Sequence, residues 1–354
     1  MATIFYSLMG EGRGHAARAR AMVERLRSRH RLILYTSHDA LAFLRGLYDA
    51  SGDVEVREIE GLKFHYSGDR LQLTKSVAKG LSLWWRVNDV IESLKPDFHR
   101  DRPDLVVTDF EPLLPRAANQ LQVPVLSLDH QHFLIAYNLN SLPFNLRAYA
   151  MGMRRFVRAF GIRPRRTVVS AFYKPPLRRG YENVIQVGPL LRPAVRAMQP
   201  RRGEHLLSYL RRSTAPRVLD MLASLDVPVR VYGLGEQPPR GMLEFRPINE
   251  QTFVEDLASC DCVIGAAGNQ LLGEALHFRK PFFALPEQKH YEQCINASFL
   301  QQLGGGDWMP IEQVGPEDFQ AFLDRREHYR EQLQQSVEPF DGTDAAAAAI
   351  EAML

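Results

Sequence analysis

The sequence predicts an α/β protein with two Rossmann-like, doubly wound domains that face each other across a cleft. Three observations predict this fold class. Strand-like and helix-like segments alternate along the chain, some strand-like segments such as Asp104–Thr108 and Val123–Leu128 are apolar runs, and the alternation restarts after a proline-rich stretch near the middle. Wholly apolar strands are typical of parallel sheets covered by helices on both faces. With 354 residues, 45% of them hydrophobic, the chain is long enough for two cores.

The elements of the first half alternate as βαβ units require. We expect strands at Ala2–Leu8, Arg31–Thr36, Asp104–Thr108 and Val123–Leu128, and helices at Ala16–Ser28 and Ala40–Leu47.

The second half repeats this rhythm. We expect strands at His205–Leu210, Val229–Tyr232, Leu243–Arg246, Cys262–Gly265 and Pro281–Leu285, and helices at Pro216–Leu225, Gln251–Ser259, Gln270–Phe278 and Tyr291–Leu303.

The domain boundary is expected where proline and glycine gather. We place the first domain at residues 1–190, a linker at 191–203 and the second domain at 204–335. Residues 336–354 contain an alanine-rich last helix, which we expect to pack back on the first domain. Ligands of doubly wound folds bind beyond the carboxyl ends of the strands, so the loops that follow strands are the candidates for the site.

Composition narrows the cellular setting. Three cysteines, Cys260, Cys262 and Cys294, are too few and badly spaced for a disulfide framework or a zinc site, which favours a reducing, cytoplasmic environment. No run of roughly 18–20 apolar residues could span a bilayer, and the first residues lack the basic region of a signal peptide.

The positive charge is unevenly distributed. Residues 145–180 carry ten basic and no acidic residues, in a chain whose formal net charge is only +3. Aromatic residues and methionines are interleaved there. This combination suits contact with the inner, anionic face of a membrane, so that membrane surface and a lipid-linked acceptor are possible partners. The alternative is a helix packed on the first domain with a solvated arginine face. No nucleic-acid-binding module is recognisable, so we expect no nucleic acid partner.

A glycine-rich loop follows the first strand. Gly10, Gly12 and Gly14 precede His15, in a spacing that departs from the G-x-G-x-x-G of dinucleotide-binding folds. A tight turn without a ligand is the alternative. His15 would lie in the first turn of a helix and could act as a general base, with Asp109 at the end of a neighbouring strand as its orienting acid. Asp109 could instead cap the next helix.

Two further loops of the second half carry polar side chains. Gly265–Leu276 is a small-residue turn that opens a helix and suits a phosphate, and Glu274 within it could accept both hydroxyls of a ribose. His290, Gln293 and Asn296 recur every third residue after the Pro281–Leu285 strand and could bind sugar hydroxyls. An ordinary helix glutamate, N-capping and solvated surface are the alternatives.

The motifs G-x-G-R-G-H-x-x-R, G-N-x-x-x-x-E-A-L, K-P and H-x-x-Q-x-x-N-A, in this order, resemble GT-B glycosyltransferases of the MurG-like and UDP-glucuronosyltransferase-like branch. The resemblance implies that the second domain binds a nucleotide-sugar and the first an acceptor. It assigns the ribose to Glu274, the diphosphate to Gly268 and Asn269, and the base to the backbone near Ile248. It also implies donor contacts for the following residues: Gly12, Gly14, Arg18, Arg211, Ser213, Gln288 and Gln293.

The expected function is sugar transfer from a nucleoside diphosphate, most simply UDP, to an acceptor hydroxyl. His15 and Asp109 suit inversion in a single displacement, and we expect no cofactor and no metal. The loop Asp129-His130-Gln131-His132 could suggest a metal but lacks an evident third ligand, so we favour an acceptor-side role or capping. Two alternatives remain: a nucleotide-sugar epimerase using Glu111 and Asp129, and a non-catalytic nucleotide-sugar-binding protein, because Ala267–Leu271 departs from the usual phosphate loop.

Overall fold

The computed structural model describes residues 1–11, 13–49, 52–61, 66–67, 70–71, 86–159, 162–211, 216–337 and 339–354. The chain divides into two compact units. The first contains Met1–Ser67, Leu71–Arg192 and the C-terminal Asp341–Leu354, and the second contains Pro193–Phe340 together with Gly68–Arg70. The segment that we expected to be a plain linker includes a short helix, α8 (Pro193–Ala197), whose first residue is a proline, as helix N-termini favour.

The first unit is built on a seven-stranded parallel sheet in the order β3-β2-β1-β6-β7-β8-β9. Its strands are β1 (Thr3–Leu8), β2 (Arg31–Thr36), β3 (Val54–Glu58), β6 (Leu105–Asp109), β7 (Val125–Asp129), β8 (Arg166–Ser170) and β9 (Ile185–Val187). A separate two-stranded sheet pairs β4 (Tyr66–Ser67) with β5 (Arg70–Leu71).

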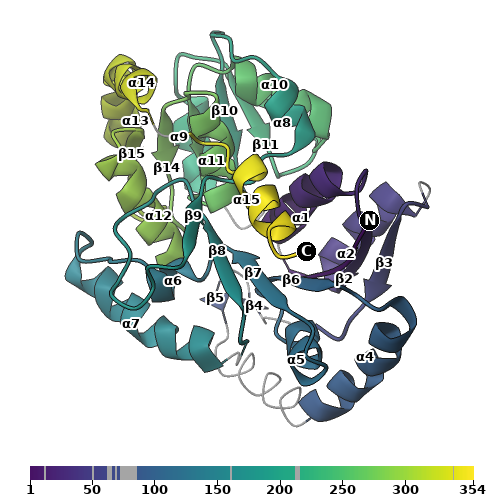
Figure 1. Ribbon diagram of the computed structural model, residues 1–354. Coiled ribbons are helices and arrows are strands. Elements are labelled where there is room, and N and C mark those ends of the chain that lie inside the picture. The colour runs from purple at the N-terminus through teal and green to yellow at the C-terminus, as the bar shows by residue number, and fades with distance from the viewer. Residues whose placement is uncertain are drawn as a thin grey trace. The chain divides into compact units, whose positions relative to one another are not determined.

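Helices cover both faces of this sheet. Alternate residues of β1 and β6 pack on one face against α1 (Arg13–Leu26), α2 (His38–Tyr48) and α15 (Thr343–Glu351). The other face packs against α4 (Val87–Asp101) and α5 (Leu113–Gln120). The C-terminal helix α15 lies beside α1 (Figure 1), and the Thr343 hydroxyl accepts a hydrogen bond from the backbone N–H of Leu191 at 2.9 Å. Two further helices, α6 (Phe133–Ala136) and α7 (Phe144–Ala159), follow β7.

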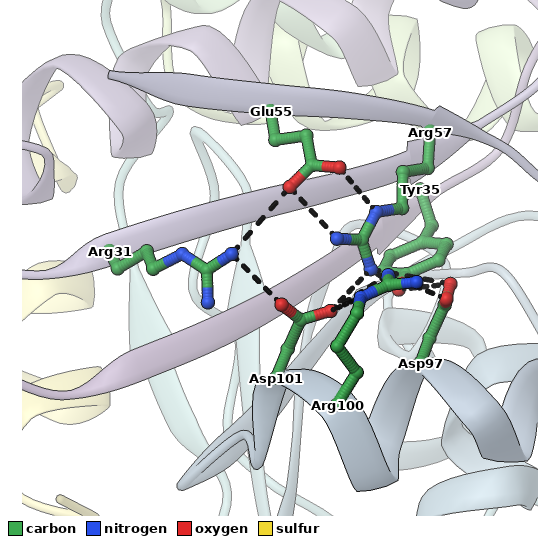
Figure 2. A network of polar contacts seen from close by, with 7 residues as sticks. All are labelled: Arg31, Tyr35, Glu55, Arg57, Asp97, Arg100 and Asp101. Atoms are coloured by element: carbon green, nitrogen blue, oxygen red, sulfur yellow. Dashed lines mark hydrogen bonds and ion pairs between the residues drawn. The ribbon is translucent and has the colours of Figure 1, made fainter. Parts of the chain in front are cut away.

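A polar network joins α4 to the outer strands β2 and β3 (Figure 2). Arg57 donates to Asp101 at 2.7 Å and to the Tyr35 hydroxyl at 2.8 Å. Burial opposes ionisation of Asp101, but hydrogen bonds from the surrounding arginines prevail and lower its pKa to about 2. The remaining members are Arg31, Glu55, Asp97 and Arg100.

The second unit contains a six-stranded parallel sheet in the order β12-β11-β10-β13-β14-β15. Its strands are β10 (Leu206–Tyr209), β11 (Val229–Tyr232), β12 (Leu243–Phe245), β13 (Val263–Gly265), β14 (Phe282–Ala284) and β15 (Gly306–Trp308). The helices are α8, α9 (Pro216–Ala223), α10 (Glu250–Ser259), α11 (Asn269–His277), α12 (Tyr291–Gln302), α13 (Pro316–Asp324) and α14 (Arg326–Gln335).

Two doubly wound parallel sheets confirm the predicted fold class. The strands that the sequence analysis did not identify are β3, β8, β9 and β15 among the strands of the two large sheets. Three of them, β3, β9 and β15, are edge strands, which are buried less completely and therefore lack a continuous apolar run. Within the described ranges, no helix has both the length and the apolar character needed to cross a bilayer.

Candidate functional site

The sheet order places the candidate catalytic residues at the switch point of the first unit. From β1 the sheet grows through β2 and β3 on one side and through β6 and β7 on the other. The loops after β1 and β6 therefore diverge at this point, where ligand sites of doubly wound sheets lie. His15 is on α1, which follows β1, and Asp109 is the last residue of β6.

His15 and Asp109 form a hydrogen-bonded pair. His15 Nδ1 lies 2.9 Å from Asp109 Oδ1, the Asp109 side chain is fully buried, and 15% of the His15 side chain is exposed. Donation to the carboxylate needs the imidazole proton on Nδ1, which leaves the lone pair of Nε2 to accept a proton. This arrangement can serve as a general base with an orienting acid.

Arg18 is a third member of this cluster. Its Nε donates to Asp109 Oδ2 at 3.0 Å and its Nη2 to Oδ1 at 2.9 Å, so both carboxylate oxygens are bound. Burial alone would raise the pKa of Asp109, but the charges of Arg18 and His15 hold that pKa below its usual value. We expected Arg18 to contact the donor; the structure instead buries its guanidinium against Asp109, because a buried carboxylate needs a charged partner.

Close packing explains one of the glycines in the first glycine-rich loop. A Cβ atom on Gly10 would lie 2.4 Å from the carbonyl oxygen of Ser37, so only glycine lets the ends of β1 and β2 approach this closely. At Gly14 the nearest atom to such a Cβ would be Arg18 Nη1 at 3.8 Å, so packing does not require glycine there. Gly12 lies outside the described residues.

A second histidine–aspartate pair follows β7, and the sequence analysis did not recognise it. His132 Nδ1 lies 2.6 Å from Asp129 Oδ2, and Ser127 Oγ donates to the same oxygen at 2.6 Å. Burial lowers the pKa of His132, but the charge of Asp129 outweighs burial, and the net shift is upward. The spacing Asp-x-x-His in the sequence could have indicated this pair. A side chain that accepts the backbone N–H three residues later, as Asp129 does from His132 at the start of α6, also lies close to the side chain of that residue.

Glu111 caps the N-terminus of α5. Its two carboxylate oxygens accept the backbone N–H groups of Leu113 at 2.7 Å and Leu114 at 2.9 Å. Desolvation outweighs these bonds and raises the pKa of Glu111 to about 7. Glu111 and Asp129, the two carboxylates that an epimerase would need, are thus both engaged in capping.

The predicted diphosphate residues lie at the switch point of the second sheet, between β10 and β13. Gly268 is the N-cap of α11, and no atom would lie within 4 Å of a Cβ added to it. Asn269 begins α11 and is buried. Arg211 follows β10, is exposed, and pairs with Glu287 at 3.1 Å. Ser213 lies outside the described residues.

Glu274 is on α11 and is held by its own helix. Only 2% of it is exposed, and Gln270 Nε2 donates to its Oε1 at 2.9 Å. The carboxylate that we assigned to the ribose therefore has a side-chain amide on it in this structure.

The remaining donor candidates separate into exposed and buried residues. Gln288 is exposed, and Ile248 after β12 is half-exposed. Gln293 is buried, and its Oε1 accepts the backbone N–H of Glu287 at 2.9 Å, which ties it to the loop after β14. Asn296 is also buried and donates to the carbonyl of Ala267 at 3.0 Å. No group of three His, Cys, Asp or Glu side chains suited to a metal ion occurs among the residues that the structure describes.

Comparison with known proteins agrees with this architecture. The family model described as glycosyl transferase family 1 matches residues 2–326. An uncharacterized glycosyltransferase of Methanosarcina mazei is 24% identical over 341 residues, which cover 86% of this chain and 84% of that protein.

Two solved structures share the fold along the whole chain. MurG of Acinetobacter baumannii superposes with a TM-score of 0.65 at 14% identity and covers 99% of this chain and 100% of its own. The UGT71G1 protein of Medicago truncatula, complexed with UDP-glucose, gives a TM-score of 0.69 at 12% identity. The match covers 99% of this chain and 98% of that protein. Together with the family match, the two doubly wound units place this chain in glycosyl transferase family 1, as a glycosyltransferase of the GT-B fold.

Proposed function

We propose that this glycosyltransferase moves a sugar from a nucleoside diphosphate, with UDP as the expected nucleotide, to an acceptor hydroxyl, with inversion and without a metal. The observation that supports it best is the 2.9 Å hydrogen bond between His15 and the buried Asp109 at the switch point of the first sheet. A base that removes the hydroxyl proton, with a carboxylate that stabilises the resulting imidazolium, suits a single displacement.

In the proposed mechanism, His15 Nε2 accepts the proton as the acceptor oxygen attacks the anomeric carbon. The bond from that carbon to the diphosphate oxygen breaks on the opposite face, so the anomeric configuration inverts. Asp109 holds the ring through Nδ1 and remains ionised, because Arg18 occupies both of its oxygens. Arg18 is accordingly a positioning residue and not a ligand of the donor.

The second unit is proposed to bind the donor. The N-terminus of α11, at Gly268 and Asn269, carries the positive end of the helix dipole and is proposed to lie against the diphosphate. Glu274 would accept the ribose hydroxyls, and the backbone near Ile248 would bind the base. Arg211 and Gln288 are exposed and would contact the phosphates or the sugar. The structural neighbour whose title names UDP-glucose supports UDP as the first nucleotide to test.

The test is nucleotide release from a panel of UDP- and dTDP-sugars, measured with and without small-molecule and lipid-linked hydroxyl acceptors. With a donor and an acceptor that the enzyme turns over, we expect His15→Gln and Asp109→Asn to lower kcat by about 10²–10⁴-fold, the usual contribution of a general base. The configuration of the product, read by NMR, checks inversion, and EDTA should leave the rate unchanged.

Two histidine variants make the test selective. His328 is exposed and remote in sequence from every candidate, so His328→Gln should keep full activity. His132→Gln tests the second pair. If His132→Gln abolished transfer while His15→Gln retained it, the base would be assigned to the wrong histidine. Nucleotide binding without turnover by any acceptor would instead favour a non-catalytic binding protein.

A further inference from the structure

Helix α7 presents a stripe of large apolar and basic side chains to solvent. Its exposed members are spaced three or four residues apart, so they cover one face about 100° wide. We call this face the α7 stripe; it consists of Phe144, Arg147, Ala148, Met151, Arg155 and Arg158. Phe144 is 77% and Met151 61% exposed, an unusual position for two large apolar side chains one above the other.

The charge around this stripe is not compensated by acids. Several exposed arginines elsewhere in the chain pair with carboxylates: Arg100 pairs with Asp97 and Asp101 in the network of Figure 2, and Arg325 pairs with Asp307. In contrast, within the described part of the chain none of the nine arginines between residues 145 and 180 forms an ion pair with an acid.

Arginines in the stripe and next to it instead donate hydrogen bonds to neutral partners. Arg154 Nε donates to the carbonyl of Leu134 at 2.7 Å, Arg178 Nη1 to that of Ile135 at 3.1 Å, and Arg158 Nη2 to the Tyr181 hydroxyl at 2.8 Å. Burial, and then the nearby charges of Arg178 and Arg158, lower the pKa of Arg154. Positive charge is thus concentrated here, and the acceptors of these hydrogen bonds between described residues are neutral oxygens.

We propose that the α7 stripe docks on an anionic lipid bilayer, with Phe144 and Met151 inserted at the headgroup level and Arg147, Arg155 and Arg158 paired with lipid phosphates. An anionic bilayer supplies both an apolar layer and a dense array of negative charge, which is the combination that this stripe displays. A free anion would account for the arginines but not for the exposed Phe144 and Met151.

The experiment is sedimentation of the full chain with large vesicles of phosphatidylcholine, alone or with roughly 30% phosphatidylglycerol. We expect binding to the anionic vesicles, little binding to the neutral ones, and a steep loss of binding as salt shortens the screening length. No donor or acceptor is needed, so the result is independent of the proposed sugar transfer.

Two double variants probe the two components of the stripe. Arg147→Gln/Arg155→Gln should lower the vesicle partition coefficient by roughly 25-fold, because each arginine near an anionic surface contributes about fivefold. Phe144→Ser/Met151→Ser should also weaken binding and leave its salt dependence in place. All four side chains are exposed, so we expect unchanged circular dichroism and melting temperature.

The matched control removes the same charge from another helix. Arg25 on α1 pairs with Asp344, and Arg29 in the turn after α1 pairs with Glu351, so Arg25→Gln/Arg29→Gln should keep vesicle binding. The proposal is overturned if anionic vesicles do not bind, if the control loses as much binding as Arg147→Gln/Arg155→Gln, or if Phe144→Ser/Met151→Ser binds like the wild type. Displacement by inorganic phosphate at constant ionic strength would identify a site for a free anion instead.

Discussion

Asp109 shows how a single buried charge limits what its neighbours can do. Arg18 and His15 both contact its carboxylate, and their charges keep its pKa low despite complete burial. A carboxylate that stays ionised near neutral pH is suited to orient His15, as the proposed mechanism requires. The same contact buries the Arg18 guanidinium against Asp109.

Gln270 is a residue whose contact leads to a prediction about donor affinity. Its amide donates to Oε1 of Glu274, the carboxylate proposed for the ribose, so a ribose that uses both oxygens of Glu274 would compete with this hydrogen bond. We expect Gln270→Ala to lower the Kd of UDP by about tenfold, since hydrogen bonds to charged groups contribute about 1.5–3 kcal/mol. Isothermal titration calorimetry measures this directly.

Helix α10 provides the control for Gln270. Gln251 Nε2 donates to Glu255 Oε1 at 3.1 Å, which is the same pair at the same spacing on an exposed face. Gln251→Ala should leave the UDP affinity unchanged. A weaker affinity in Gln270→Ala would show that the amide contacts the donor rather than blocking it.

At the scale of elements, the carboxylate that caps the start of α5 makes the free energy of unfolding depend on pH. Leu113 and Leu114 donate backbone N–H groups to Glu111, whose burial raises its pKa from 4.5 to about 7. For an acid with a raised pKa, the folded protein holds the proton that the unfolded chain releases. Stability therefore falls as pH rises from about 4.5 to about 7 and is level above that range.

Glu111→Gln removes this titration, so we predict that the stability of the variant relative to the wild type increases between pH 5 and pH 7.5. Hydrogen exchange of the β6 and β7 amides, compared between the two proteins at each pH, measures the difference for the first unit alone. A difference that is constant across this range would contradict a raised pKa at Glu111. Glu60→Gln, an exposed carboxylate that pairs with Arg86, is the control and should show no such trend.

At the scale of the whole molecule, each unit packs around its own buried residues, and one hydrophobic cluster of the first unit draws on both ends of the sequence. Helix α15 adds Ala346, Ala347 and Ile350 to the core of the first unit, beside α1. The second unit has its own core, which includes Leu222 on α9.

Each core should therefore respond to its own truncations. Ile350 and Leu222 are fully buried, and replacing either with alanine should cost about 2–5 kcal/mol. We expect Ile350→Ala to accelerate hydrogen exchange in β1 and β6 and to spare β10 and β13, and Leu222→Ala to do the reverse. Equal acceleration in both sheets by either variant would mean that the units unfold together.

Much of the fold was predictable from local patterns. Strands β13 and β14 are wholly apolar and β1, β6 and β7 are mostly so, and such runs need only neighbouring residues to be recognised. The motifs that follow these strands identified the family. His15 and Asp109 could be paired in advance because each follows a strand, and ligand sites of doubly wound sheets gather where such strands end.

The sequence by itself therefore determined the fold class, the family and the strand ends at which polar residues gather. Only the tertiary structure decided that Arg18 binds Asp109, that Gln293 accepts the backbone N–H of Glu287, and that the arginines near α7 pair with no acid among the residues described. Arg18 and Asp109 are 91 residues apart in the chain. Periodicity and motif spacing act over a few residues, whereas these contacts depend on strand order and on which side chains burial brings together.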